Sequence, residues 1–155
     1  MHSLLKILSA RICLLIRYFR YLIFARHYSG HGLHSPFIFE FANSVLFIKE
    51  SNKKYKKVQD FKSRFTKNRN FIETDDKGAG SSIVRTQIRR IDKICKTSST
   101  RTKYGKILAR IVSFYKPVNI IELGTSLGVG TSYLALNLQK NSSLYTIEGD
   151  KNLHK

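Results

Sequence analysis

The chain has 155 residues and a mass of 17.9 kDa, enough for one domain with a sizeable core, and its apolar fraction of 42% and charged fraction of 25% exclude an intrinsically disordered chain. The net charge of +18 comes almost wholly from residues 1–115, which hold 24 Lys and Arg against 7 Asp and Glu, whereas residues 116–155 hold 4 against 3. A surface this basic attracts phosphate-bearing partners or anionic lipid, although a lysine-rich composition without any function explains the charge equally well.

The first predicted element is a helix over residues 3–27. Its apolar positions follow helical spacing at Leu4, Leu8, Leu15, Tyr18 and Leu22. Single charges interrupt every apolar run, so the segment predicts neither a membrane span nor a signal peptide. Such a helix either packs on the domain or lies on an anionic membrane surface, and packing is the favoured interpretation.

The next stretch reads "GHGLHSPFIFEFANSVLF". Glycines end the first helix, and Pro36 is predicted to open a second helix with Ser35 as its N-cap. His31 and His34 resemble a metal pair, but no third ligand lies near them in the sequence. We therefore predict no metal site.

Nine Lys and Arg residues follow between Lys49 and Arg69, with Tyr55, Phe61 and Phe65 interleaved among them. Rings between cations are typical of a nucleic-acid surface, where bases stack and phosphates are neutralised. The alternative is a helix with one solvated basic face, and we favour that alternative.

The segment "ETDDKGAGSS" predicts a turn, because two of its residues are glycines. An amphipathic helix is expected after it, with one face formed by Val84, Ile88, Ile91 and Cys95. The segment "SSTRTKYGKILARIVSFYKP" predicts another helix that Pro117 ends. Its inward positions are expected to be Tyr104, Leu108, Ile111, and Val112 or Tyr115.

From Val118 the pattern changes to strand, helix and strand, in "VNIIEL", "VGTSYLALNLQK" and "SLYTIEGD". This β-α-β unit is typical of an α/β protein with a doubly wound parallel sheet. We therefore divide the chain into a basic, mainly helical region at residues 1–97 and the start of a Rossmann-like domain at residues 98–155. Cys13 and Cys95 lie far apart and are expected to be buried thiols in a reducing compartment.

A glycine-rich turn connects the first strand to its helix in the pattern E-x-G-x-x-x-G-x-G, from Glu122 to Gly130. The spacing excludes a P-loop, because Val129 stands where that motif needs glycine and no lysine follows. It also excludes the dinucleotide motif, whose third glycine would fall on Tyr133. Glu148 ends the second strand, where a carboxylate can accept hydrogen bonds from both hydroxyls of a ribose held by the turn.

In "IELGTSLGVGTSYLA" and "LYTIEGD" the sequence resembles the class I S-adenosylmethionine-dependent methyltransferases. Upstream, "HGLHSPFIF", "DDKGAGSS" and "TKYGKILARIV" are similar to successive landmarks of uncharacterised methyltransferases common in Bacteroidetes. Together these landmarks span residues 17–155.

The resemblance implies S-adenosylmethionine as cofactor and a methyl acceptor of unknown class. It implies that Gly124 and Gly128 line the methionine and ribose portions and that Glu122 orients the loop. Glu148 would hold the ribose hydroxyls, and Thr125 and Ser126 would add polar contacts. A motif of unassigned role, expected to cover the pocket, comprises Asp76, Gly78, Ala79 and Gly80.

The family fold usually has about seven strands, and this chain supplies two, so we expect a truncated member. Two rival functions remain open: a nucleic-acid-binding protein and a peripheral membrane protein, each with a relic cofactor motif. The nucleic acid or the anionic membrane surface would bind within residues 3–69. Without a secretion signal, the cytoplasm is the expected location, with or without peripheral attachment to a membrane.

Overall fold

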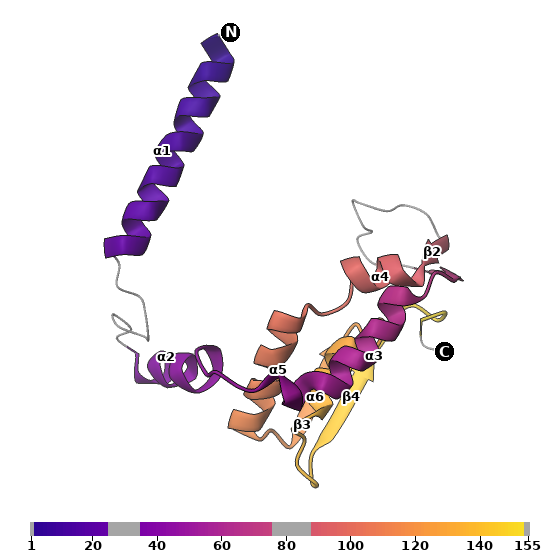
Figure 1. The fold of residues 1–155 in the computed structure, drawn as a ribbon. Helices are drawn as coiled ribbons and strands as arrows, with labels where there is room; N and C mark the ends of the chain where they lie inside the picture. Colours follow the sequence, from indigo (N-terminus) through magenta and orange to yellow (C-terminus); the bar gives the residue numbers. More distant parts are fainter. Residues whose placement is uncertain (1, 25–34, 76–87, 154–155) are drawn as a thin grey trace. The chain divides into compact units, whose positions relative to one another are not determined.

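The structure is a computed structural model that describes residues 2–24, 35–75 and 88–153 (Figure 1). Within these ranges the chain is a mixed α/β protein with two small two-stranded sheets, one antiparallel and one parallel. It forms two compact units, Met1–Ile48 and Lys49–Lys155.

The first unit contains α1 (His2–Phe24), α2 (Pro36–Phe41) and a π-helical turn (Ala42–Leu46). The predicted start of α2 is confirmed: the Ser35 hydroxyl accepts a hydrogen bond from the Ile38 amide at 3.4 Å, and Pro36 occupies the first turn. Every side chain from residue 11 to residue 24 is exposed. Cys13, expected to be buried, is exposed with them.

The second unit holds the remaining elements, which are the 3₁₀-helix Asn52–Tyr55, α3 (Lys56–Lys67), β1 (Phe71–Glu73), β2 (Ile88–Arg90), α4 (Ile91–Thr97), α5 (Thr102–Tyr115), β3 (Asn119–Leu123), α6 (Val129–Ala135) and β4 (Ser143–Ile147). Its core is a buried cluster of Tyr55, Val58, Ala109, Val129 and Tyr133. This cluster joins α3, α5 and α6, so the region before residue 98 and the β-α-β unit share one core.

The basic-aromatic stretch contributes its rings to that core. Tyr55 is fully buried, with its ring centroid 6.1 Å from that of Tyr133, and Phe61 and Phe65 pack against the cluster. Burial, together with a hydrogen bond to Glu50, raises the pKa of the Tyr55 hydroxyl. The ring of Tyr55 is therefore not available to stack on a nucleic-acid base, which removes one part of the nucleic-acid interpretation.

An antiparallel strand pair takes the place of the described part of one predicted helix before Ile91, and Val84 of that helix lies outside the described residues. Ile88 pairs with Glu73, and α4 begins only at Ile91. The Ile91 amide donates to the Asn70 carbonyl at 3.0 Å and the Asp92 amide to the Asn68 carbonyl at 2.9 Å, so the segment between α3 and β1 satisfies the first donors of α4. The prediction of a helical face through Ile88 is therefore wrong, whereas Cys95 is buried in α4 as expected.

The inward face of α5 is formed by its small residues. Gly105, Ala109 and Val112 are buried, which confirms Val112 as an inward position. Tyr104, predicted to point inward, is 55% exposed, and Tyr115, the predicted alternative to Val112, is 43% exposed. Gly105 sets this rotation, because it lies against the Tyr133 ring of α6 with no room for a Cβ atom.

The β-α-β prediction is confirmed. Strands β3 and β4 pair in parallel from Asn119 with Ser143 to Leu123 with Ile147, and α6 lies between them in sequence. The helix ends at Ala135, several residues earlier than predicted. The expectation of a buried strand is not met, since no residue of β3 or β4 is buried and four side chains on one face are 56–80% exposed: Ile121, Leu123, Tyr145 and Ile147.

Candidate functional site

The glycine-rich turn between β3 and α6 is built from left-handed backbone. Gly124, Ser126 and Gly128 have φ angles of +90°, +48° and +70°. The Gly124 amide donates to the Ile147 carbonyl at 2.8 Å, which carries the parallel pairing one residue beyond β3. Glycine is needed at positions 124 and 128 because L side chains rarely adopt these angles.

The third glycine has a different purpose. A Cβ atom on Gly130 would lie 2.6 Å from Oε1 of Glu122. Oε2 of Glu122 accepts hydrogen bonds from the hydroxyls of Thr131 at 2.5 Å and Thr146 at 2.9 Å. Glu122 therefore ties β3 to α6 and β4 and fixes the base of the turn, where its carboxylate lies outside the pocket lining.

Glu148 follows β4 and stands at the open end of the same turn. Its Oε2 accepts a hydrogen bond from the Ser126 amide at 2.5 Å, and its Oε1 accepts one from the Asp150 amide at 3.0 Å. A carboxylate oxygen has two acceptor positions. Each oxygen of Glu148 thus retains capacity for one further donor.

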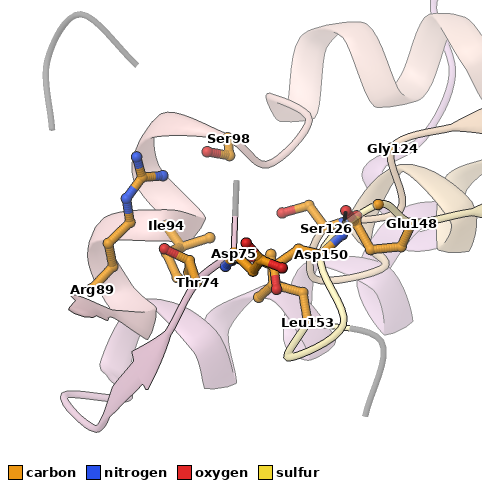
Figure 2. A pocket seen from close by; sticks show the side chains of 11 residues that line it. Thr74, Asp75, Arg89, Ile94, Ser98, Gly124, Ser126, Glu148, Asp150 and Leu153 are labelled. Atoms are coloured by element: carbon orange, nitrogen blue, oxygen red, sulfur yellow. Dashed lines mark hydrogen bonds between the residues drawn. The ribbon is translucent and has the colours of Figure 1, made fainter. Parts of the chain in front are cut away.

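A pocket of about 400 Å³ lies beside this carboxylate. It is lined by Thr74, Asp75, Arg89, Ile94, Ser98, Gly124, Ser126, Glu148, Gly149, Asp150 and Leu153 (Figure 2). One wall comes from the β1–β2 hairpin and α4, and the other from the turn after β3 and the segment after β4. Its volume is at the lower end of the range for small-molecule sites.

The two walls are joined through a buried carboxylate. Oδ2 of Asp150 accepts a hydrogen bond from the Asp75 amide at 2.9 Å, and its Oδ1 accepts one from the Asn152 amide at 2.9 Å. A bidentate pair between Arg90 and Asp92, at 3.0 and 2.8 Å, fixes the corner between β2 and α4. Hydrogen bonding from Arg90 holds the pKa of Asp92 below its usual value.

The charge of the pocket is opposite to that of the chain. Three of the ten acidic residues, Asp75, Glu148 and Asp150, line it against one basic residue, Arg89. A phosphate group would meet more repulsion than attraction there, whereas a neutral or cationic ligand with hydroxyl donors matches the lining. The buried hydroxyl oxygen of Ser126 has no hydrogen-bond partner among the residues that the structure describes, so it adds a polar group for a ligand.

The structure places the sequence-predicted residues in three groups. Gly124, Ser126 and Glu148 line the pocket. Thr125 and Gly128 shape the turn without reaching the pocket wall, and the Thr125 hydroxyl shares a 2.5 Å hydrogen bond with that of Thr146. The motif expected to cover the pocket, comprising Asp76, Gly78, Ala79 and Gly80, lies outside the described residues.

Sequence reasoning missed Arg89, Ile94 and Asp150. Arg89 and Ile94 reach the pocket only because of the hairpin, which the sequence did not predict. A local signal existed for Asp150, which stands two residues after Glu148 at the end of a parallel strand. No metal-binding group of three His, Cys, Asp or Glu residues occurs in the described ranges, and His31 and His34 lie outside them.

A scan against protein-family models, a search of curated proteins and a search of solved structures each gave no match to this chain.

Proposed function

We propose that this chain binds S-adenosylmethionine and is, by resemblance, a methyltransferase with a Rossmann-like doubly wound fold. The observation that carries the proposal is an acid-lined pocket on a strongly basic chain, placed where two parallel strands end at a glycine-rich turn. Open α/β sheets bind ligands at this edge. The acidic lining favours a ligand that carries a positive charge and sugar hydroxyls over one that carries phosphates.

The residues present fit this cofactor. The two oxygens of Glu148 have the remaining capacity to accept the ribose hydroxyls, and the bare backbone of Gly124 permits close approach. Asp75 and Asp150 would supply negative charge toward the ammonium and sulfonium groups, while Ile94 and Leu153 would offer apolar contact. The cofactor, when bound, supplies a methyl group activated by its sulfonium.

The chain's own contribution is binding and alignment. The hydrogen bonds of Glu122 hold the turn, and the amides of Ser126 and Asp150 hold the Glu148 carboxylate in place before any ligand arrives. A preorganised carboxylate loses little conformational entropy on binding, which favours affinity. Fixed placement of the cofactor is also what alignment of a methyl donor with an acceptor requires.

The test is calorimetric titration of the full chain with S-adenosylmethionine, its demethylated product and ATP. We expect the two sulfur compounds to bind and ATP to bind much more weakly. Glu148→Ala should weaken cofactor binding at least tenfold, because hydrogen bonds to charged groups contribute about 1.5–3 kcal/mol. Glu73→Ala is the matched control, since it removes one exposed carboxylate outside the pocket lining.

Two outcomes would contradict the proposal. Tighter binding of ATP than of S-adenosylmethionine would show that the acidic lining does not select the ligand. Equal affinities of the Glu148→Ala and Glu73→Ala variants would show that Glu148 does not hold the cofactor.

A further inference from the structure

The first unit presents an apolar surface that its own residues do not cover. Among its described side chains only Ala42 and Val45 are buried, whereas large apolar side chains are exposed along α1 and α2. The exposed members in residues 11–24 are Ile12, Leu14, Leu15, Ile16, Tyr18, Phe19, Tyr21, Leu22, Ile23 and Phe24. Exposed apolar patches of this extent mark interaction surfaces.

Four of these apolar side chains share one face of α1. Ile12, Leu15, Phe19 and Leu22 follow the i, i+3, i+7 and i+10 spacing of one helix face. Cys13, Arg17, Arg20 and Phe24 form a stripe on the other side, in which two arginines stand one turn apart. Arg11 lies four residues before Leu15 on the apolar side, where a long arginine chain can extend its guanidinium toward water.

The charge of this segment identifies the kind of partner. Residues 1–39 contain five Lys and Arg, at Lys6, Arg11, Arg17, Arg20 and Arg26, and no Asp or Glu. An apolar helix face that is combined with cations and no anions is complementary to a surface that is anionic outside and apolar beneath. Tyr18 and Phe19 add aromatic rings of the kind that settle between lipid headgroups and acyl chains.

From this arrangement we infer that α1 lies flat on an anionic phospholipid bilayer, with the Ile12–Leu22 stripe toward the acyl chains and Arg17 and Arg20 toward the headgroups. No helix in the described ranges is long and apolar enough to cross a bilayer, so the contact is with one leaflet. The interaction is separate from the acidic pocket, which belongs to the other compact unit.

The test is sedimentation of the full chain with vesicles of phosphatidylcholine, alone or with 30% phosphatidylglycerol. We expect binding to the anionic vesicles, and binding at least tenfold weaker to the neutral ones. Arg17→Gln with Arg20→Gln should weaken binding about 30-fold, because each arginine near the anionic surface strengthens binding about fivefold. Leu15→Ser with Leu22→Ser should weaken it about 100-fold or more at unchanged charge, because two leucines no longer leave water.

The matched control is Lys56→Gln with Lys57→Gln, which removes the same charge from exposed positions at the start of α3. It should change vesicle affinity less than threefold. Equal losses in the control and in the arginine variant would overturn the inference in favour of general charge attraction. Equal binding to neutral and anionic vesicles would also overturn it, as would no binding to either.

A second copy of the chain is the competing occupant of this face. Light scattering of the lipid-free protein would detect such a dimer. A dimer that the variant with Leu15→Ser and Leu22→Ser no longer forms, together with no binding of the unchanged chain to vesicles, would overturn the inference. Near-ultraviolet circular dichroism from the Tyr55 and Tyr133 rings reports whether each variant retains the core of the second unit. Vesicle binding that persists in Glu148→Ala would show that the lipid contact does not depend on the proposed cofactor site.

Discussion

Gly105→Ala is the sharpest test of how α5 packs on α6. A Cβ atom at this position would lie 2.3, 2.4 and 2.7 Å from Cδ2, Cε2 and Cγ of Tyr133. Carbon atoms in contact are normally about 3.5–4.0 Å apart, so the overlap exceeds an ångström. Tyr133 is fully buried in the core cluster, and its ring has no solvent to move into.

Two opposing effects decide the magnitude. Alanine in a helix interior is favoured over glycine by about 0.8–1 kcal/mol. Overpacking a well-filled core costs about 1–3 kcal/mol, occasionally more, and the overlap with a ring is at the severe end. We therefore expect Gly105→Ala to lower the free energy of unfolding by about 1–2 kcal/mol, although the same change stabilises most exposed helices.

Urea denaturation followed by far-ultraviolet circular dichroism measures this change as a lower midpoint at an unchanged slope. Ser113→Ala is the matched control, since it improves helix propensity at an exposed site of the same helix and should leave stability equal or slightly higher. Combining Gly105→Ala with Tyr133→Leu should cost less than the sum of the two single changes, because the smaller side chain makes room. Unchanged or increased stability of Gly105→Ala would refute the α5–α6 contact.

The remaining predictions concern the turn and the hairpin corner. Gly124→Ala places a Cβ on a residue with φ of +90°, so it should cost about 1–2 kcal/mol of stability and weaken cofactor binding in calorimetry. Gly130→Ala forces the Glu122 carboxylate to move and should weaken cofactor binding in the same titration, although no pocket residue changes. The lowered pKa of Asp92 means that its pairing with Arg90 stabilises the fold above the unfolded-state pKa near 4 and is lost as pH falls through the lower folded value. Urea midpoints measured from pH 7 to pH 3 should therefore fall less steeply in Asp92→Asn than in the unchanged chain.

Local signals in the sequence were sufficient to predict the β-α-β unit. The apolar run into Glu122, the glycines that follow it and the second apolar run are all contiguous, and each constrains the backbone within a few residues. The same is true of the Ser35 cap and Pro36, whose effect is confined to one helical turn.

The hairpin could not be predicted in this way. Each of its strands has three residues, and each forms only because its partner residues lie 15–19 positions away. The spacing of Ile88, Ile91 and Cys95 is also that of a helical face, so the periodicity was misleading. Because Arg89 reaches the pocket through this hairpin, one wall of the candidate site was missed along with it.

The rotation of α5 was missed for a different reason. Apolar size suggested that Tyr104 points inward, but the contact with α6 depends on small residues that let the helices approach closely. Close packing between the helices, and not the hydrophobicity of single side chains, determines which face of α5 is buried. Glu122 is a similar case, because its hydrogen bonds to Thr131 and Thr146 depend on how α6 and β4 pack against β3.

The open face of the β3–β4 sheet has a consequence for how the protein behaves as a colloid. Ile121, Leu123, Tyr145 and Ile147 attract the same face on other molecules, while a net charge of +18 keeps the molecules apart. Salt shortens the range of this repulsion from about 10 Å at 0.1 M to about 3 Å at 1 M and leaves the apolar attraction in place. Solubility should therefore fall as ionic strength rises, and dilute buffers of low salt are the conditions in which single molecules are measured.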